Sequence, residues 1–288
     1  MAKAGFHPTR GELVDIGGRR LRVVRAGPET VQPLIVLECG AFGCAADWAV
    51  VQQRLADKGL RSLAYDRAGL GYSDPGPRPR DGRAIAIDLE TLLSHVGEAG
   101  PLILVGHSMG GLLLRVFVGR NHDRVAGVVL VDAVTPETIE SPVAARAING
   151  FRRAMKLVGR WSGIGFMKPF ALVVGDKIGL EGEASTEKRR IYGLASHAHW
   201  SAEEVLHWAA TSAQGREIGH YHPDLPVAVV NAGATRLPAG LKAIQAAPAH
   251  ASARGYVADI VGANHSTLLG KRFADPIIVG IEHVMAEG

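Results

Sequence analysis

Short, wholly apolar runs that alternate with segments of helical length form the main pattern of the chain. The apolar runs, rich in Val, Ile and Leu, lie at residues 33–40, 61–69, 101–108 and 125–134. The helix-like segments lie at 48–58, 83–97 and 110–122. Runs without polar alternation are typical of strands buried on both faces of a parallel sheet. This βαβα order predicts an α/β fold, with a mostly parallel twisted sheet flanked by helices and right-handed crossovers.

The ends of the chain and its middle depart from this alternation. Residues 10–26 form two short β-type runs around a glycine pair, which predicts a hairpin. No strand-like run occurs in residues 135–222, which contain three of the four tryptophans. Strand-like runs return at 225–233 and 253–263. We therefore expect a core made of residues 1–134 and 223–288, with residues 135–222 inserted as a helical cap over the sheet.

The composition is that of a folded globular protein. Of the 288 residues, 47% are hydrophobic and 21% are charged, which argues against the disordered, collagen-like and coiled-coil classes. The formal net charge is +4, and basic residues occur in short clusters without interleaved aromatic residues. Nucleic acid is therefore not an expected partner, because nucleic-acid-binding proteins concentrate basic residues on one face.

Neither the cysteines nor the apolar segments indicate secretion or a membrane. Cys39 and Cys44 are too few and too close for a disulfide framework or a four-ligand zinc site, so we expect small buried side chains. The first residues lack the apolar core of a signal peptide, and no stretch reaches the ~18 apolar residues of a membrane span. We expect a cytoplasmic protein without a membrane partner, and the sequence leaves the oligomeric state open.

The most specific motif is Gly-His-Ser-Met-Gly at 106–110, between an apolar run and a helix-like segment. In such a turn, the glycines two positions before and after the serine let strand and helix approach closely, and the serine Oγ is exposed above the sheet. This context predicts that Ser108 is a nucleophile. The Met109 N–H, at the start of the helix, would then face a developing oxyanion.

Five segments together resemble the α/β-hydrolase superfamily, and within it the capped, esterase-like members. They are LECGAFG, AYDRAGLGYSD, LVGHSMGG, VLVDA and GANHSTLL. The resemblance extends from the N-terminal hairpin to His265. It implies that nucleophile, acid and histidine follow one another along the chain in that order.

His265 is the candidate general base. It follows a strand-like run directly, which places it on a loop at the carboxyl end of a strand, where open α/β sheets have their sites. It also fits the chain order of the family. Two His-x-His segments, 197–199 and 220–222, lack the ligand pattern of a metal site, so we expect them on the surface of the cap or along its pocket.

Asp132, at the end of the run VVLVDAV, is the best candidate for the acid. Many relatives carry the acid after the next strand, but residues 231–236 contain no Asp or Glu here. Some members of the superfamily use the loop that Asp132 occupies. A helix-capping or turn role before Pro136 is the alternative. The other candidate carboxylates are Asp259, Asp224 and Glu38.

The turn after the first apolar run should supply the second oxyanion donor. We expect this donor to be the N–H of Ala41, with Phe42 as the alternative and the Phe42 ring lining an acyl pocket. The remaining pocket candidates are Trp161, Phe166, Phe170 and Trp200. These aromatic residues suit the cap's own core equally well. In the family's turn at 65–71, we expect Asp66 and Arg67 to pair with each other.

These residues predict a carboxylic ester hydrolase that acts on a hydrophobic small molecule. Ser108 would attack, His265 would take its proton and Asp132 would orient His265, with neither metal nor organic cofactor. An aspartate in place of the serine would have indicated an epoxide hydrolase or dehalogenase. The same triad can cleave lactones, amides or carbon-carbon bonds, transfer acyl groups or form peracids. A slow-turnover ligand receptor on this fold is the alternative from another class.

Overall fold

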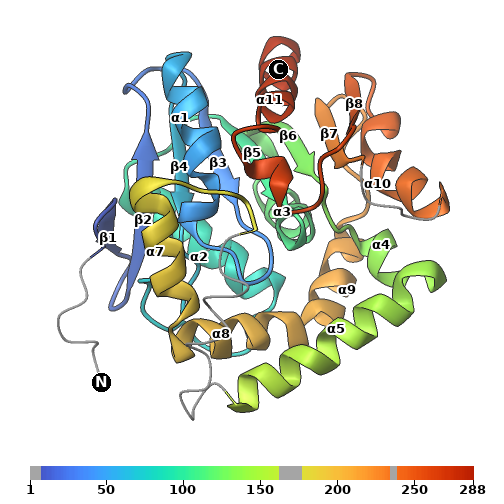
Figure 1. Ribbon diagram of the computed structural model, residues 1–288. Helices are drawn as coiled ribbons and strands as arrows, with labels where there is room; N and C mark the ends of the chain where they lie inside the picture. Colours follow the sequence, from blue (N-terminus) through green and yellow to red (C-terminus); the bar gives the residue numbers. More distant parts are fainter. Residues whose placement is uncertain (1–7, 162–176, 234–238) are drawn as a thin grey trace.

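The computed structural model describes residues 8–161, 177–233 and 239–288. Eight strands form one sheet in the order β1-β2-β4-β3-β5-β6-β7-β8 (Figure 1). Their bounds are β1 (Glu12–Asp15), β2 (Arg20–Ala26), β3 (Leu34–Glu38), β4 (Ser62–Tyr65), β5 (Leu102–His107), β6 (Val125–Val131), β7 (Val227–Ala232) and β8 (Gly255–Ile260). β1 and β2 form a hairpin, β2 also pairs antiparallel with β4, and all other pairs are parallel. The predicted hairpin and mostly parallel sheet are confirmed.

Helices follow most of the parallel strands, as the alternating pattern predicts. The α-helices of the described residues are α1 (Ala49–Asp57), α2 (Gly82–His95), α3 (Met109–Arg120), α4 (Pro136–Glu140), α5 (Pro142–Trp161), α7 (Gly182–Tyr192), α8 (Ala195–Leu206), α9 (Trp208–Ile218), α10 (Ala239–Ala251) and α11 (Asp275–Glu287). Short 3-10 helices lie at 45–48, 122–124 and 267–269.

The side chains of the buried strands divide the core into two layers. Ile35 and Leu37 of β3 belong to the same apolar cluster as the buried faces of α1 and α11. Leu34 and Val36 belong to the cluster that includes the apolar faces of α2 and α3. Successive side chains on a strand point to opposite faces, so a strand covered by helices on both faces needs apolar residues throughout. This geometry explains the continuous apolar runs.

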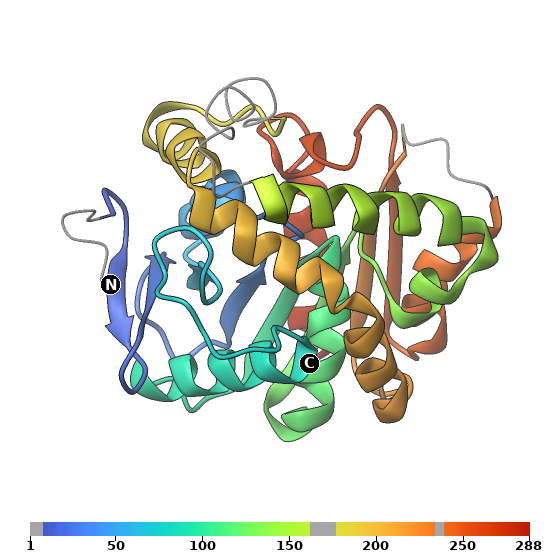
Figure 2. The same ribbon diagram turned by 90° about the horizontal axis from the view of Figure 1, so that it is seen from below.

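The chain between β6 and β7 contributes α4, α5, α7, α8 and α9, and none of its described residues forms a strand. Helices α5 and α8 run side by side across one end of the sheet (Figure 1 and Figure 2). Ile148 and Met155 of α5 and Val205 of α8 share an apolar cluster with Met109, the first residue of α3. These helices therefore lie over the end of the sheet where β5 turns into α3. That residues 135–222 form a separate cap unit stays a prediction.

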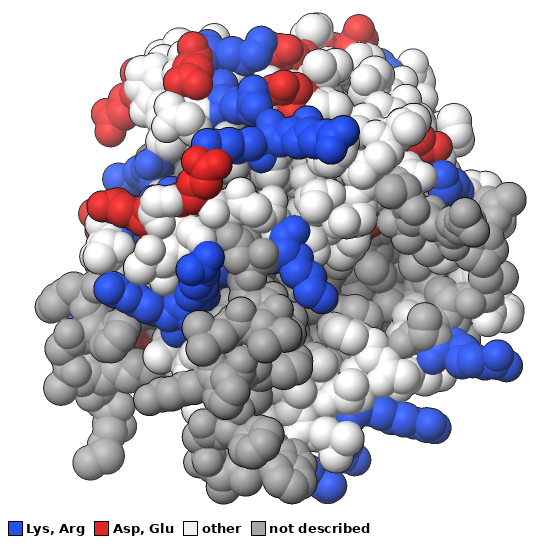
Figure 3. Space-filling view, viewed as in Figure 1, with Lys and Arg blue, Asp and Glu red and all other residues white. Residues whose placement is uncertain are grey.

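Charged side chains are spread over the surface. On the face in Figure 3, Lys and Arg stand apart or beside Asp and Glu, and they do not gather in one patch. Exposed pairs such as Lys58 with Glu282, at 2.6 Å, join the end of α1 to α11. Each such pair contributes only ~0–1 kcal/mol. None of the described helices combines the length and the apolar composition that crossing a lipid bilayer requires.

The approach of α3 to β3 yields a stability prediction. A Cβ at Gly110 would lie 2.6 Å from the carbonyl oxygen of Glu38, a backbone atom of β3. We expect Gly110→Ala to lower the free energy of unfolding by about 1–3 kcal/mol, because the helix would have to move away from the sheet. Denaturant unfolding followed by circular dichroism measures this change.

Gly150→Ala is the matched control for this prediction. Gly150 lies inside α5, and nothing lies within 4 Å of the position of an added Cβ. The same chemical change should therefore raise the free energy of unfolding by about 0.5–1 kcal/mol through helix propensity. A Gly110→Ala variant as stable as Gly150→Ala would contradict the steric account.

Candidate active site

The turn from β5 into α3 holds Ser108 in a rare backbone conformation, with φ 54° and ψ −121°. Close packing leaves no room for side chains two positions before and after Ser108. A Cβ at Gly106 would lie 2.8 Å from the carbonyl carbon of Gly110. The Ser108 carbonyl accepts hydrogen bonds from the N–H groups of Val134 (2.8 Å) and Gly111 (3.1 Å). The strand thus reverses into a helix at a single partly exposed serine.

His265 and Asp132 meet from the loops that follow β8 and β6. The distance from His265 Nδ1 to Asp132 Oδ2 is 2.6 Å. The Asp132 side chain is 5% exposed and that of His265 is 47% exposed. The Ala232 N–H donates to the other carboxylate oxygen, Oδ1, at 3.2 Å. With Asp132 ionised, His265 carries a proton on Nδ1, so the neutral ring keeps its lone pair on Nε2.

The pKa of Asp132 reflects this pairing. Burial alone would raise the pKa of the carboxyl group. The hydrogen bond and the charge attraction from His265, together with the Ala232 N–H, outweigh burial and lower the pKa of Asp132 below its ordinary value. Asp132 is therefore an anion at neutral pH.

His107 supports the loop of His265 from inside the turn. Its Nε2–H donates to the backbone carbonyl of His265 at 2.9 Å, and the two rings lie 4.6 Å apart. Burial, and then repulsion from a protonated His265, lower the pKa of His107 to about 3. His107 thus stays neutral while it holds the loop. Sequence reasoning missed this contact because 158 positions separate the two residues.

Backbone strain gathers in three neighbouring loops. Of the non-glycine residues that the structure describes, Phe42, Ser108 and Asp132 have positive φ angles, of 59°, 54° and 42°. They follow β3, β5 and β6, which are adjacent in the sheet. Such conformations cost about 1–3 kcal/mol each and cluster at functional sites. They coincide with the turn, the serine and the carboxylate that the sequence singles out.

The turn of residues 40–43, here called the oxyanion turn, begins beside Ser108. The Gly43 N–H closes the turn by donating to the Gly40 carbonyl at 3.1 Å. A Cβ at Gly40 would lie only 3.0 Å from the Cβ of Ser108. The turn that carries the predicted donors Ala41 and Phe42 therefore begins beside the serine.

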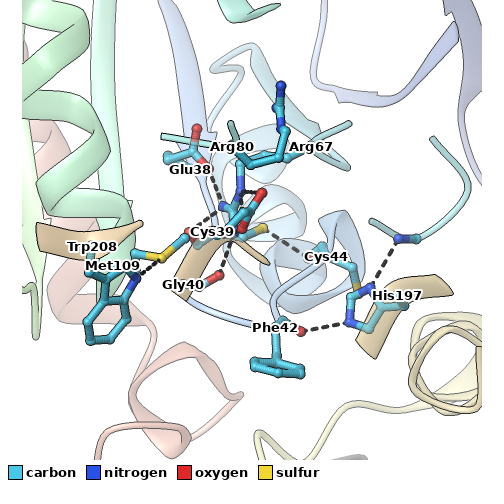
Figure 4. Close-up of polar contacts among 12 residues, drawn as sticks. Glu38, Cys39, Gly40, Phe42, Cys44, Arg67, Arg80, Met109, His197 and Trp208 are labelled. Atoms are coloured by element: carbon cyan, nitrogen blue, oxygen red, sulfur yellow. Dashed lines mark hydrogen bonds and ion pairs between the residues drawn. The ribbon is translucent and has the colours of Figure 1, made fainter. Parts of the chain in front are cut away.

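His197 of α8 joins this turn to the loop after β4 (Figure 4). It donates from Nε2 to the Phe42 carbonyl and accepts the Gly71 N–H at Nδ1, both at 3.1 Å. Because the amide can only donate, His197 is neutral with its proton on Nε2. The side chain is 1% exposed, so a position on the surface of the cap is wrong for His197, and the alternative position along the pocket stays a prediction.

The predicted pair between Asp66 and Arg67 does not form. Arg67 binds Glu38 and Glu204, with Nη1–Oε1 and Nη2–Oε2 distances of 2.6 and 2.8 Å. Asp66 faces Arg22 at 3.4 Å and accepts the N–H groups of Ala45 and Tyr72. The prediction fails because successive side chains at the end of a strand point in opposite directions and so meet different partners.

The alternative carboxylates have other surroundings. Glu38 accepts hydrogen bonds from the Tyr65 hydroxyl and from Arg67, and burial raises the pKa of Glu38 despite the Arg67 charge. Asp224 is exposed, 3.7 Å from His222. Asp259 is exposed on β8. Asp132 is therefore the candidate carboxylate that the structure brings to His265.

An apolar cluster lies against the oxyanion turn and the start of α3. Its buried members are Ile85, Met109, Leu113, Val205 and Trp208, and its partly buried members are Ala41, Phe42, Ile139, Ile148 and Met155. The Trp208 Nε1–H points at the Met109 sulfur, 2.6 Å away. Sequence reasoning missed most of these residues. The seven-residue spacing of Ile148 and Met155 does indicate that they share one face of a helix.

The structure describes only some of the predicted pocket residues, and these lie in different surroundings. Phe42 belongs to the apolar cluster. Trp200 packs on Gly69 and lies 5.1 Å from the Arg78 guanidinium, so its pocket role stays a prediction. Phe166, Phe170 and the side chain of Trp161 lie outside the described residues.

Metal-ligating side chains are scattered. In the part of the chain that the structure describes, no group of three or more His, Cys, Asp or Glu residues is placed to hold a metal ion. Cys39 and Cys44 are both free and buried, and burial raises the pKa of each thiol. Their expected state as small buried side chains is confirmed.

Sequence comparison finds similarity to known proteins over part of the chain. A model of the alpha/beta hydrolase fold family matches residues 33–157. An AB hydrolase superfamily protein of Gibberella zeae is 38% identical over 132 residues, which cover 44% of this chain and 41% of that protein. Epoxide hydrolase A of Mycobacterium tuberculosis is 38% identical over 121 residues, 40% of this chain and 36% of that protein. The chain therefore spans less than half the length of these relatives.

Solved structures extend the likeness to nearly the whole chain. A thermophilic esterase from Thermogutta terrifontis has a TM-score of 0.70 at 23% identity and covers 93% of this chain and 94% of its own. A putative epoxide hydrolase from Pseudomonas aeruginosa has a TM-score of 0.73 at 18% identity and covers 99% of both chains. At these identities the likeness concerns the fold. Together with the family model and the strand order, it shows that the chain has the α/β-hydrolase fold.

Proposed function

We propose that this protein is a serine hydrolase that cleaves an ester bond of a hydrophobic small molecule through an acyl-enzyme. The observation that carries the proposal is the strained backbone at Phe42, Ser108 and Asp132 in adjacent loops, with Asp132 bound to His265 at 2.6 Å. Strain of this kind persists only where the surrounding structure imposes it, and active sites are where it gathers. The arrangement supports a nucleophile, an acid-base pair and an oxyanion turn at one edge of the sheet.

The proposed reaction uses the side chains as follows. Asp132 holds the His265 proton on Nδ1, so Nε2 accepts the proton of Ser108 as Oγ attacks the acyl carbonyl. The N–H groups of Met109 and Ala41 would bind the oxyanion. The imidazolium, stabilised by Asp132, then protonates the leaving alcohol. Water, activated by His265 in the same way, then attacks the acyl-enzyme, and the carboxylic acid leaves as Ser108 regains its proton.

The surroundings of Ser108 support a hydrophobic substrate. The apolar cluster around Met109 combines the oxyanion turn with residues of α5, α8 and α9. Apolar side chains at this position favour an acyl or alcohol group with little polarity, because burial of apolar surface drives its binding. We propose that the helices between β6 and β7 act as the cap that encloses it.

The serine also separates this proposal from epoxide hydrolysis. Esterases and epoxide hydrolases both occur among the similar structures. Epoxide opening through an alkyl-enzyme ester needs a carboxylate nucleophile, whereas position 108 carries a hydroxyl. Lactones, amides, carbon-carbon bonds and acyl transfer use the same groups, so a substrate panel must include them.

We expect the wild-type protein to react with a fluorophosphonate probe and to hydrolyse esters from a panel of graded acyl length. Ser108→Ala should abolish labelling and lower kcat by roughly 10⁴-fold or more, since the nucleophile is lost. His265→Ala should have a similar effect, because triad members act as a unit. Mass spectrometry of the labelled protein locates the modified residue.

Retained labelling in Ser108→Ala would refute the nucleophile assignment. Labelling of the wild type with a pre-steady-state burst and no sustained turnover would favour the slow-turnover receptor instead. Thermal unfolding of each variant serves as the control, because a loss of labelling is informative only while the fold is intact.

A separate expectation concerns the acid. Asp132→Asn should lower kcat by up to ~10⁴-fold, because the amide favours the wrong imidazole tautomer while its oxygen still accepts the Ala232 N–H. Asp259→Asn, on an exposed strand position, is the matched control and should leave kcat nearly unchanged. Steady-state kinetics of both variants make the comparison. An Asp132→Asn variant that keeps more than about a tenth of the wild-type kcat would refute this role, since tenfold is only ~1.4 kcal/mol of barrier.

The pH dependence should report one ionisation on its acid side. Asp132 has a pKa below its ordinary value of 3.8, and His107 has a pKa of about 3. Both keep one protonation state above about pH 5, and Asp132 stabilises the fold until the pH falls through its lowered pKa. The logarithm of kcat/KM should therefore rise with a slope of one on its acid side, because neither Asp132 nor His107 adds a second ionisation there. A slope of two in this range would show that a second group titrates with it.

A further inference from the structure

Arg67 is fully engaged by groups on three elements. Its Nη1 donates to Glu38 Oε1 at 2.6 Å and to the Cys39 carbonyl at 2.7 Å. Its Nη2 donates to the Gly40 carbonyl at 2.9 Å and to Glu204 Oε2 at 2.8 Å. Its Nε donates to Glu204 at 3.0 and 3.1 Å. Figure 4 shows Arg67 beside Glu38, Cys39 and Gly40, at the end of β3. All five guanidinium protons thus have acceptors.

Two of these acceptors are the backbone carbonyls of Cys39, just before the oxyanion turn, and of Gly40, its first residue. A peptide unit is planar and trans, so the carbonyl of one residue and the N–H of the next point in opposite directions. When Arg67 fixes the Gly40 carbonyl, it also fixes the Ala41 N–H and directs it away from the guanidinium. Gly40 itself lies against Ser108, because a Cβ added to Gly40 would lie 3.0 Å from the Cβ of Ser108. The contact, together with the Gly43 N–H on the same carbonyl, therefore orients the Ala41 N–H, one of the two backbone donors proposed for the oxyanion.

Glu204 fixes the orientation of Arg67 from the far side. It lies on α8, 137 residues later in the chain, and its carboxylate binds the guanidinium through both Nε and Nη2. The Arg67 and Glu204 side chains are each 1% exposed. A bidentate pair leaves the planar guanidinium one orientation, and burial keeps both side chains away from bulk solvent. A helix of the inserted chain thus sets the direction of the Cys39 and Gly40 carbonyls.

We propose that Arg67 is the positioning residue of the oxyanion hole, and that Glu204 of α8 holds it in place. This inference rests on the proposed function, because it assigns Arg67 to the stabilisation of an acyl-transfer intermediate. Arg67 acts through the backbone and touches no substrate atom. Its loss should therefore weaken transition-state binding more than substrate binding, and kcat should fall while KM changes little.

The test compares an ester with its thionoester, in which sulfur replaces the carbonyl oxygen. Sulfur accepts hydrogen bonds from amides poorly, so the oxyanion hole favours the oxygen compound. Arg67→Lys supplies three donors without the planar geometry. We expect it to lower kcat for the ester by about 10²-fold, as the loss of an oxyanion donor does, and the ester-to-thionoester rate ratio by about tenfold or more. Glu204→Gln keeps an acceptor oxygen without the charge and should shift the ratio in the same direction by less.

Arg22 and Glu187 supply matched controls. Arg22 is also a buried arginine between two carboxylates, Asp66 and Glu187, and Glu187 likewise lies on a helix of the inserted chain. Their described contacts do not include the oxyanion turn. Arg22→Lys and Glu187→Gln should lower thermal stability and leave the rate ratio at the wild-type value. This separates oxyanion positioning from the general loss of a buried ion pair.

The outcomes are distinct. An unchanged ratio in both Arg67→Lys and Glu204→Gln would overturn the inference, whether or not overall activity falls. If Arg67→Lys does not fold, Glu204→Gln alone decides. A wild-type protein that hydrolyses neither ester nor thionoester and resists fluorophosphonate would refute the proposed function itself. An active wild type with unchanged ratios in the variants would refute only the role of Arg67.

Discussion

The turn at Ser108 is the constraint on which the other loops of the site depend. A strand that reverses into a helix at one residue brings the first turn of α3 against the end of β3. There, a Cβ added to Gly110 would clash with the Glu38 carbonyl oxygen. The same packing places Gly40 beside Ser108 and lets the Ser108 carbonyl accept the Val134 N–H. The loops after β3 and β6 are thereby fixed relative to the loop after β5. Strain at the serine is stable only because these backbone contacts act together.

Buried polar contacts, rather than apolar packing alone, hold these loops in register. Arg67, Glu38 and Glu204 are almost fully buried, and removing charges from water costs several kcal/mol per ion before partners compensate. Replacing such a group with well-packed apolar residues is often neutral or stabilising. The arrangement therefore contributes orientation more than stability. His107 and His197 add the same kind of contact with neutral rings, each donating to a backbone carbonyl of a site loop.

Much of the fold could be predicted because its signals are local. The strands are buried on both faces, so each appears as an apolar run, and the Ser108 turn needs glycines at fixed positions. The loop of His265 followed from the rule that sites lie at the carboxyl ends of parallel strands. The loop of Asp132 followed from the resemblance to superfamily members that carry the acid there. Helix α10 was not predicted, since Pro248 in its interior argues against a helix. The partner of Arg67 and the position of Trp208 depend on which face of the helices between β6 and β7 meets the sheet, and local pattern does not encode that orientation.

The oxyanion turn explains why these long-range contacts are needed. Its third residue, Phe42, has a φ of 59°, a conformation that glycine adopts freely and a bulky side chain disfavours. The local sequence therefore opposes the turn, and contacts from outside must hold it. Two of them come from α8, through His197 to the Phe42 carbonyl and through Glu204 and Arg67 to the Gly40 carbonyl. A turn held in this way needs no further ordering when charge develops beside it, which is the condition under which backbone donors stabilise an oxyanion most effectively.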